Sequence, residues 1–247
     1  MTGGKINRKR QGSTGATPCG GAPSRAIYDD QHRSRKMAIA RPGKIVCVGR
    51  NYREHAVELG NVVPQEPLLF LKPSTAVIGD GDTIVLPPES ARVEHEAEIA
   101  VVIGKRIRRV PEAQALAALA GITCLNDVTA RDLQRREEQW TRAKGFDTFC
   151  PLGPRVVPLE QVRLAELEVR CRVNGIERQR GHAHDMVFGL AALVAFASQA
   201  MTLEPGDVIA TGTPGGVGPL TAGDVVEVEI PGVGVLRNPV AAESRKA

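Results

Sequence analysis

The chain has 247 residues, of which 42% are hydrophobic and 24% charged, as expected for a soluble globular protein with a sizeable core. No apolar run approaches the ~20 residues that span a bilayer. The five cysteines are widely spaced without a C-x-x-C pair, which argues against a disulfide framework or a zinc knuckle. Aromatic residues make up only 3%, too few for a platform that stacks single-stranded nucleic acid.

Residues 1–36 differ in composition from the rest of the chain. They hold eight Lys or Arg and two Asp, so this segment carries +6 and leaves −2 of the net +4 to the remainder. The segment is rich in Gly and Ser and nearly free of aliphatic residues, so we expect a disordered tail. It lacks the apolar core of a secretion signal and the amphipathic period of a transit peptide. We favour Met37 as the start of the protein and residues 37–247 as its single domain.

Short apolar runs bounded by Pro or Gly predict β-strands along this domain. In chain order they span 44–48, 68–71, 83–86, 93–104, 121–125, 167–173, 176–179, 207–210, 225–230 and 234–237. Asn174-Gly175 predicts a hairpin turn between two of them. Helices are expected at 52–60, 111–120, 130–141 and 185–201, the last with Asp185 as its N-cap, and 144–151 reads as a loop. Many strands and few helices predict a β-rich α+β fold with a rolled sheet or barrel.

The stretch 93–104 begins acidic and ends in an apolar run closed by a glycine. Side chains two apart on a strand share a face, so Glu94, Glu96 and Glu98 line one face and His95 packs on the other. Three carboxylates on one face repel each other and lose hydration, which a bound cation would resolve. The alternative is an edge strand whose wet face carries the carboxylates. This stretch alone leaves both interpretations open.

Two further signals suit a site that binds an ion. Asp127 ends a separate predicted strand, and residues 211–219 form a Gly-rich loop without the Lys-Ser/Thr ending of a P-loop. Together Glu96, Glu98 and Asp127 would offer oxygen ligands alone. Such a set suits a hard ion such as Mg²⁺, Mn²⁺ or Ca²⁺ rather than Zn²⁺.

Six segments, in order and at the expected spacing, give the chain a family resemblance. They are residues 48–52 (VGRNY), 69–74 (LFLKPS), 95–104 (HEAEIAVVIG), 127–132 (DVTARD), 140–151 and 211–219 (TGTPGGVGP). In these segments the chain resembles the fumarylacetoacetate hydrolase family, in its single-domain branch of acylpyruvate hydrolases, oxaloacetate decarboxylases and dienedioate isomerases. The resemblance implies a rolled mixed β-sheet with a few flanking helices, and a cytoplasmic homodimer.

The same resemblance assigns roles to individual residues. It implies a Mg²⁺ or Mn²⁺ ion held by Glu96, Glu98 and Asp127. It also implies a lid with a His–Glu pair, a lysine beside the substrate oxygens, and contacts to the substrate carboxylate or 2-oxo group. In this chain those residues are His55 and Glu58, then Lys144, then Arg131, Gln134 and Thr213. Glu94 receives no role, and we expect it to be a solvated neighbour.

The implied partner is a small 2-oxo acid rather than nucleic acid or a membrane. Acylpyruvate hydrolysis is the leading expectation, because His55 oriented by Glu58 could activate water for C–C cleavage through a metal-stabilised enolate. The same enolate would serve oxaloacetate decarboxylation or tautomerisation, and isomerisation of 2-hydroxyhepta-2,4-diene-1,7-dioate. A rival from another class is a non-catalytic metal-binding protein whose basic tail contacts nucleic acid.

Overall fold

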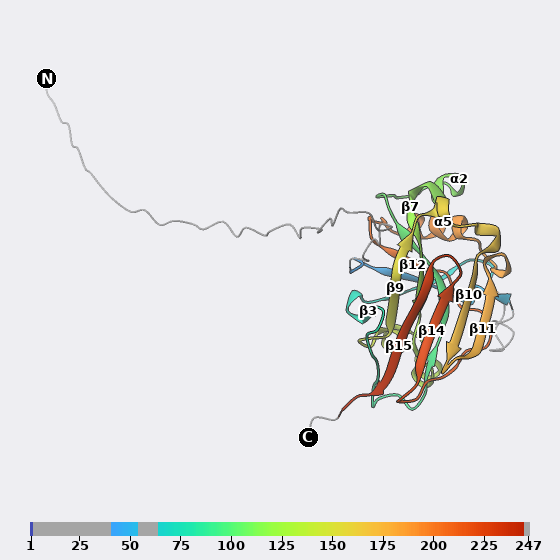
Figure 1. Ribbon diagram of the computed structural model, residues 1–247. Coiled ribbons are helices and arrows are strands. Elements are labelled where there is room, and N and C mark those ends of the chain that lie inside the picture. Colours follow the sequence, from blue (N-terminus) through green and yellow to red (C-terminus); the bar gives the residue numbers. More distant parts are fainter. Residues whose placement is uncertain (2–40, 54–63, 245–247) are drawn as a thin grey trace. The chain divides into compact units, whose positions relative to one another are not determined.

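The structure is a computed structural model that describes Met1, residues 41–53 and residues 64–244. The chain divides after Ser34, and every element below belongs to the unit Arg35–Ala247. This unit is rich in strands and poor in helices, and its mixed sheets curl into a half-barrel (Figure 1). The expected β-rich α+β fold with a rolled mixed sheet is confirmed. The expected tail, 1–36, falls outside the described residues apart from Met1 and stays a prediction.

Within the described residues, the largest sheet has seven strands and is mixed. Strands β1 and β12 pair in parallel, as do β3 and β9, and the other neighbours are antiparallel. From one edge to the other, the strands are β2 (Leu68–Lys72), β1 (Ile45–Gly49), β12 (Val208–Ala210), β6 (Ala97–Ile103), β7 (Leu119–Asn126), β9 (Cys150–Val157) and β3 (Val77–Ile78).

Two smaller sheets complete the described part of the fold. The second sheet has the order β11 (Ile176–His182), β10 (Glu168–Val173), β14 (Val225–Ile230), β15 (Gly234–Ala242) and β4 (Ile84–Leu86). It packs on the first sheet through β10, β14 and β15, which contact β6, β7 and β9. The third sheet places β5 (Val93–His95) between β13 (Gly218–Pro219) and β8 (Thr129–Ala130).

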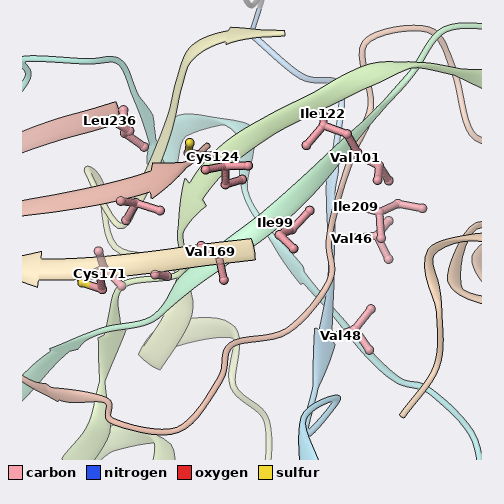
Figure 2. Close-up of a cluster of buried hydrophobic side chains, with 14 of the residues drawn as sticks. Val46, Val48, Ile99, Val101, Ile122, Cys124, Val169, Cys171, Ile209 and Leu236 are labelled. Atoms are coloured by element: carbon pink, nitrogen blue, oxygen red, sulfur yellow. The ribbon is translucent and has the colours of Figure 1, made fainter. Parts of the chain in front are cut away.

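Strand β6 is buried on both faces, which explains its unbroken apolar run. One face, with Ile99 and Val101, packs between the two large sheets against residues such as Val169 and Leu236 (Figure 2). The other face, with Ala100 and Val102, packs against a second cluster that includes Cys47 on β1. Glu98 shares this second face, so the fold places a carboxylate at the end of a buried apolar surface.

The helices are short and differ from the expected bounds. The described α-helices are α2 (Glu112–Ala115), α3 (Arg131–Arg136), α4 (Thr141–Gly145) and α5 (Leu190–Ala200). Single 3-10 turns span Ser74–Ala76, Leu116–Ala118, Leu159–Gln161, Leu164–Glu166 and Ala183–Asp185. Helices α2 and α5 pack together (Figure 1). No helix among the described residues is long and apolar enough to cross a bilayer.

Three helix predictions need correction. Helix α5 begins at Leu190 with Gly189 as its N-cap, whereas Asp185 ends a 3-10 turn and accepts a hydrogen bond from the backbone N–H of His182. The expected helix at 111–120 ends early, because Leu119 already pairs with Ile103 in the main sheet. The expected helix at 130–141 ends at Arg136, because Glu137 is extended, and a separate helix, α4, begins at Thr141 and continues into the expected loop at 144–151. The helix expected at 52–60 lies largely outside the described residues.

Two strand predictions also change. The predicted strand at 93–104 is two strands, β5 and β6, which belong to different sheets and break at Glu96. At the break, the backbone N–H of Glu96 donates to the side-chain oxygen of Asn126, at the end of β7, at 2.9 Å instead of to a backbone carbonyl. Strand β9 begins at Cys150, inside the expected loop at 144–151, and it contains two prolines, which are unusual within a strand.

Candidate functional site

The three predicted metal ligands meet where β5 gives way to β6. Glu96 is the residue between those strands, Glu98 lies on β6, and Asp127 directly follows β7. One carboxylate oxygen of each lies within 4.8 Å of the other two. The antiparallel pairing of β6 with β7 brings them together, and the backbone N–H of Asp127 donates to the Glu96 carbonyl at 2.8 Å. We call these three residues the carboxylate cluster.

Buried cations surround the carboxylate cluster. The Lys144 ammonium lies 2.7 Å from Glu96 and 2.6 Å from Asp127, and Lys72 lies 2.6 Å from the other Asp127 oxygen. Arg131 donates to Glu96 at 2.5 Å. Burial lowers the pKa of Lys144, but Asp127 and Glu96 outweigh burial and raise that pKa to about 12. Lys144 is therefore positively charged at neutral pH.

Glu98 is the member of the cluster whose charge is least compensated. It accepts a hydrogen bond from the backbone N–H of Gly212 at 2.7 Å, but within the described residues no cationic side chain forms an ion pair with it. Burial raises the pKa of Glu98, and the neighbouring Asp127 and Glu96 raise it further. The cluster thus holds a carboxylate that a bound cation would stabilise.

Glu94 corrects an expectation from the sequence. It is 2% exposed rather than solvated, because β5 is the central strand of the third sheet. Arg131 donates to Glu94 from Nε at 2.6 Å, and Arg92 donates to its other oxygen at 2.6 Å. Burial raises the pKa of Glu94, but Arg131 and Arg92 outweigh burial and lower it. Glu94 therefore holds the arginine that reaches Glu96.

A pocket of about 360 Å³ opens over the carboxylate cluster. Phe70 and Trp140 form part of its wall, with ring centroids 5.3 Å apart in an edge-on arrangement, and Lys144 lies 5.1 Å from the Phe70 ring centroid. The remaining lining residues are Val48, Gly49, Arg50, Glu96, Glu98, Asp127, Arg131, Gln134, Arg135, Lys144 and Thr213. The pocket thus combines a carboxylate floor with cationic and aromatic walls.

Four residues predicted from the resemblance line this pocket: Lys144, Arg131, Gln134 and Thr213. The Gln134 side-chain oxygen accepts from Arg131 at 2.5 Å, so the two act as one group. Residues His55 and Glu58 lie outside the described residues. The structure brings the pocket residues together, and the role of each in binding or catalysis stays a prediction.

Sequence reasoning missed two buried residues that hold the site. Lys72 lies in the segment 69–74, yet no role was assigned to it, although its contact with Asp127 makes it part of the charge balance. Gln179 stands between two exposed arginines on β11 and is 1% exposed. A neutral amide at an inward position of a highly charged strand is a weak signal that could have identified it.

The sequence matches the family described as fumarylacetoacetate (FAA) hydrolase, C-terminal, over residues 44–241, which contain the whole carboxylate cluster and its pocket. The chain belongs to the fumarylacetoacetate hydrolase family. An uncharacterized protein of Methanocaldococcus jannaschii is 51% identical over 203 residues, which cover 82% of this chain and 85% of that protein. A mitochondrial oxaloacetate tautomerase of Bos taurus is 46% identical over 212 residues, which cover 82% of this chain and 68% of the tautomerase.

Solved structures of the fumarylacetoacetate hydrolase family share the fold. The structure of a 5-carboxymethyl-2-hydroxymuconate delta-isomerase from Mycobacterium smegmatis matches with a TM-score of 0.78 at 46% identity. The match covers 85% of this chain and 83% of the isomerase. Tautomerases and isomerases thus stand among the relatives of this family member.

The residues at the cluster fit a divalent metal ion. All three donors are carboxylates, which suit Mg²⁺ or Mn²⁺, and their oxygens lie close enough to share one ion. Glu98 forms no ion pair with a described side chain, so a bound cation would stabilise its ionised form. Family membership and this cluster together support a divalent metal site.

Proposed function

We propose that this protein is a Mg²⁺- or Mn²⁺-dependent enzyme that interconverts keto and enol forms of a short 2-oxo diacid, with oxaloacetate as the first candidate. The observation that carries the proposal is the carboxylate cluster at the floor of a pocket that also presents Lys144 and Arg131. The similarity to a mitochondrial oxaloacetate tautomerase favours this chemistry within the family.

The pocket suits a small dianionic substrate. Its volume of about 360 Å³ lies at the small end for ligand sites, as a four-carbon diacid needs. Arg131 is fixed through Glu94, Glu96 and Gln134, so its guanidinium cannot turn freely and can orient a carboxylate. Phe70 lies against Lys144 and packs on Trp140, and these two rings exclude water there and strengthen the electrostatic interactions of the pocket.

Lys144 is the residue we assign to charge stabilisation. Its ammonium is buried and protonated, and it lies against two of the three carboxylates. As negative charge develops on the substrate's C2 oxygen, this ammonium can turn towards that oxygen and donate a hydrogen bond. A divalent cation, when bound at the cluster, would polarise the 2-oxo group as a Lewis acid.

Acylpyruvate hydrolysis remains a second candidate, because the sequence holds both His55 and Glu58. Acylpyruvate hydrolysis needs a general base that activates water for attack on the distal carbonyl. Tautomerisation needs no attacking water. His55→Ala should lower acylpyruvate hydrolysis by ~10²–10⁴-fold and lower turnover of oxaloacetate less. Equal losses on both substrates would exclude His55 as the residue that activates water.

The decisive experiment is a substrate panel with Mg²⁺ and with EDTA. Oxaloacetate, acetylpyruvate and 2-hydroxyhepta-2,4-diene-1,7-dioate are followed by ultraviolet absorbance of the enol or diene. We expect fast ketonisation of enol-oxaloacetate with Mg²⁺ and loss of that activity with EDTA. Turnover of only one of the other two would reassign the substrate within the family. No turnover of any substrate, with metal bound, would favour the non-catalytic alternative.

We also propose an oligomeric state, a location and a partner for this enzyme. A homodimer in the cytoplasm, a small-molecule partner, and a basic segment 1–36 without a catalytic role are consistent with the proposed function. Sedimentation velocity of the full chain would test the expected dimer, and a monomer at micromolar concentration would contradict it.

A further inference from the structure

Gln179 links the second sheet to the two segments that build the pocket. Its side-chain nitrogen donates to the Thr213 hydroxyl and to the Pro214 carbonyl, both at 2.8 Å. Its side-chain oxygen lies 3.1 Å from the backbone nitrogen of Ala97 and 2.8 Å from His95 Nδ1. A primary amide has two hydrogens and two lone pairs, so every hydrogen-bonding position of Gln179 is used.

The orientation of this amide is fixed by its backbone partners. The Pro214 carbonyl can only accept, so the atom facing it is the nitrogen. The Ala97 N–H can only donate, so the atom facing it is the oxygen. It follows that His95 carries its hydrogen on Nδ1 and donates to Gln179.

β11 and the Gly-rich loop also lie very close together. A Cβ atom on Gly181 would lie 2.6 Å from Pro214 Cβ, and one on Gly216 would lie 2.1 Å from the Arg178 carbonyl oxygen. Gln179 sits between these two contacts in sequence, so the loop cannot move away from its amide without opening this packing.

The Thr213 hydroxyl is left with a single free position. It accepts from Gln179 and donates its only hydrogen to the Ala97 carbonyl at 2.8 Å. A hydroxyl has one hydrogen and two lone pairs, so what remains is one lone pair. Thr213 lines the pocket, and any hydrogen bond that its hydroxyl makes to a ligand there is one that it accepts.

We propose that Gln179 is a positioning residue that holds the Thr213 hydroxyl as an acceptor, so that the pocket selects ligands with an O–H donor at this position. Anionic oxygens are matched by Arg131 and Lys144, and Thr213 matches an enol or hydroxy group. The inference rests on the proposed function, because a 2-oxo acid carries such a donor in its enol form alone.

Binding of small acids to the full-length protein with Mg²⁺ tests this selection without requiring turnover. The members of each of two probe pairs differ in the group at one carbon: either enantiomer of lactate against pyruvate, and 3-hydroxypropionate against malonate. In each pair the first member carries an O–H donor where the second carries a carbonyl or carboxylate oxygen. Calorimetry gives the dissociation constant of each probe, and the readout is the ratio of the two dissociation constants within each pair.

We expect Thr213→Val to weaken the hydroxyl member of at least one pair roughly three- to tenfold, with the other member changed less than about twofold. Thr213→Ser, which keeps the hydroxyl, should keep the ratio. Gln179→Leu should shift the ratio of dissociation constants within a pair in the same direction. The double variant Thr213→Val/Gln179→Leu should have the same ratio as Thr213→Val alone. If Gln179→Leu does not melt cooperatively, Gln179→Met replaces it.

Asn238→Leu is the matched control. Asn238 is also 1% exposed, and its side-chain amide donates to the backbone carbonyls of Gly79 and Asp82, away from the pocket. It should lose stability as Gln179→Leu does but keep both ratios. Unchanged ratios in Thr213→Val would overturn the inference while leaving the proposed function intact. Failure of the wild-type protein to bind any probe would overturn both.

Discussion

At the scale of single residues, the site is a balance of buried charges. Four carboxylates, at Glu94, Glu96, Glu98 and Asp127, stand against the cations Lys72, Arg131 and Lys144, and each of these side chains belongs to a residue at most 5% exposed. Burying an ion is costly unless it is paired. With every group ionised, these seven buried groups carry one more negative than positive charge; the exposed Arg92 pairs with Glu94, and Glu98 is the carboxylate without an ion pair among the described residues. A cation at the cluster would complete the balance.

Replacing Glu98 tests this balance directly. Glu98→Gln keeps the shape and removes a carboxylate whose ionised form is disfavoured by burial and by Asp127 and Glu96, so the metal-free protein should melt at the same or a higher temperature. Mg²⁺ affinity, measured by calorimetry, should fall by at least roughly a hundredfold, beyond the 10–100-fold typical of residues that only support a ligand. Glu160→Gln, at an exposed carboxylate, is the control. Retained Mg²⁺ binding in Glu98→Gln would remove Glu98 from the ligand set.

Glu94 offers a second test at this scale. Glu94→Ala leaves Arg131 buried with one carboxylate partner fewer, and removing one member of a buried pair typically costs about 3–5 kcal/mol. Urea unfolding should show a loss of this order. Glu177→Ala, which breaks the exposed pair with Arg180, should leave the unfolding midpoint unchanged. Equal effects of the two variants would mean that Glu94 is solvated in solution, as the sequence first suggested.

At the scale of elements, the break between β5 and β6 and the loop at 211–219 position the carboxylates. β5 pairs in the third sheet and β6 in the first, so Glu96 turns from one sheet to the other. The loop reaches the cluster through the backbone N–H of Gly212, which donates to Glu98. Gly212 has φ +98°, a left-handed conformation that favours glycine.

Two glycines with the same backbone conformation, Gly212 and Gly223, distinguish the cost of backbone strain from the cost of a steric clash. A Cβ on Gly212 would lie 2.8 Å from Asn51 Cβ, whereas Gly223, with φ +96°, has nothing within 4 Å. Gly223→Ala should therefore cost roughly 1 kcal/mol of unfolding free energy through backbone strain alone. Gly212→Ala should cost more and should also weaken Mg²⁺ binding, because the loop N–H moves away from Glu98. Similar unfolding midpoints and similar Mg²⁺ affinities for the two variants would contradict this role for the loop.

At the scale of the whole molecule, the site depends on segments far apart in the chain. The pocket draws on β1, β2, the β5–β6 junction, the end of β7, helices α3 and α4, and the Gly-rich loop. These segments meet because β6 and β7 are central strands of the first sheet, buried under the second sheet. The family match starts at residue 44, so the site is built from the region after the basic segment.

Removing residues 1–36 tests whether that segment contributes. A chain that begins at Met37 should show the same melting temperature, Mg²⁺ affinity and turnover as the full chain, because every described contact of the site lies after residue 43. Circular dichroism melting and the oxaloacetate assay measure this. Lost activity in a truncated protein that melts normally would assign a function to the basic segment.

Much of the fold can be predicted from local sequence patterns. Apolar runs between Pro and Gly located most strands, with β14 at its observed bounds, and Asn174-Gly175 forms the expected turn with φ of 52° and 77°. The spacing of Glu96 and Glu98 and the six ordered segments identified the family and the carboxylates. These signals are local, or rest on similarity, and need no knowledge of which segments pack together.

What tertiary structure alone decided depends on partners distant in sequence. Asn126 interrupts the predicted strand at Glu96, pairing in the main sheet ends the helix predicted at 111–120, and the third sheet buries Glu94. Lys72 and Gln179 become part of the site only because β2 and β11 are brought to it. Local sequence is enough to identify the family and the candidate ligands. Long-range packing sets which charges are buried and paired, because burial depends on neighbours that a local pattern does not contain.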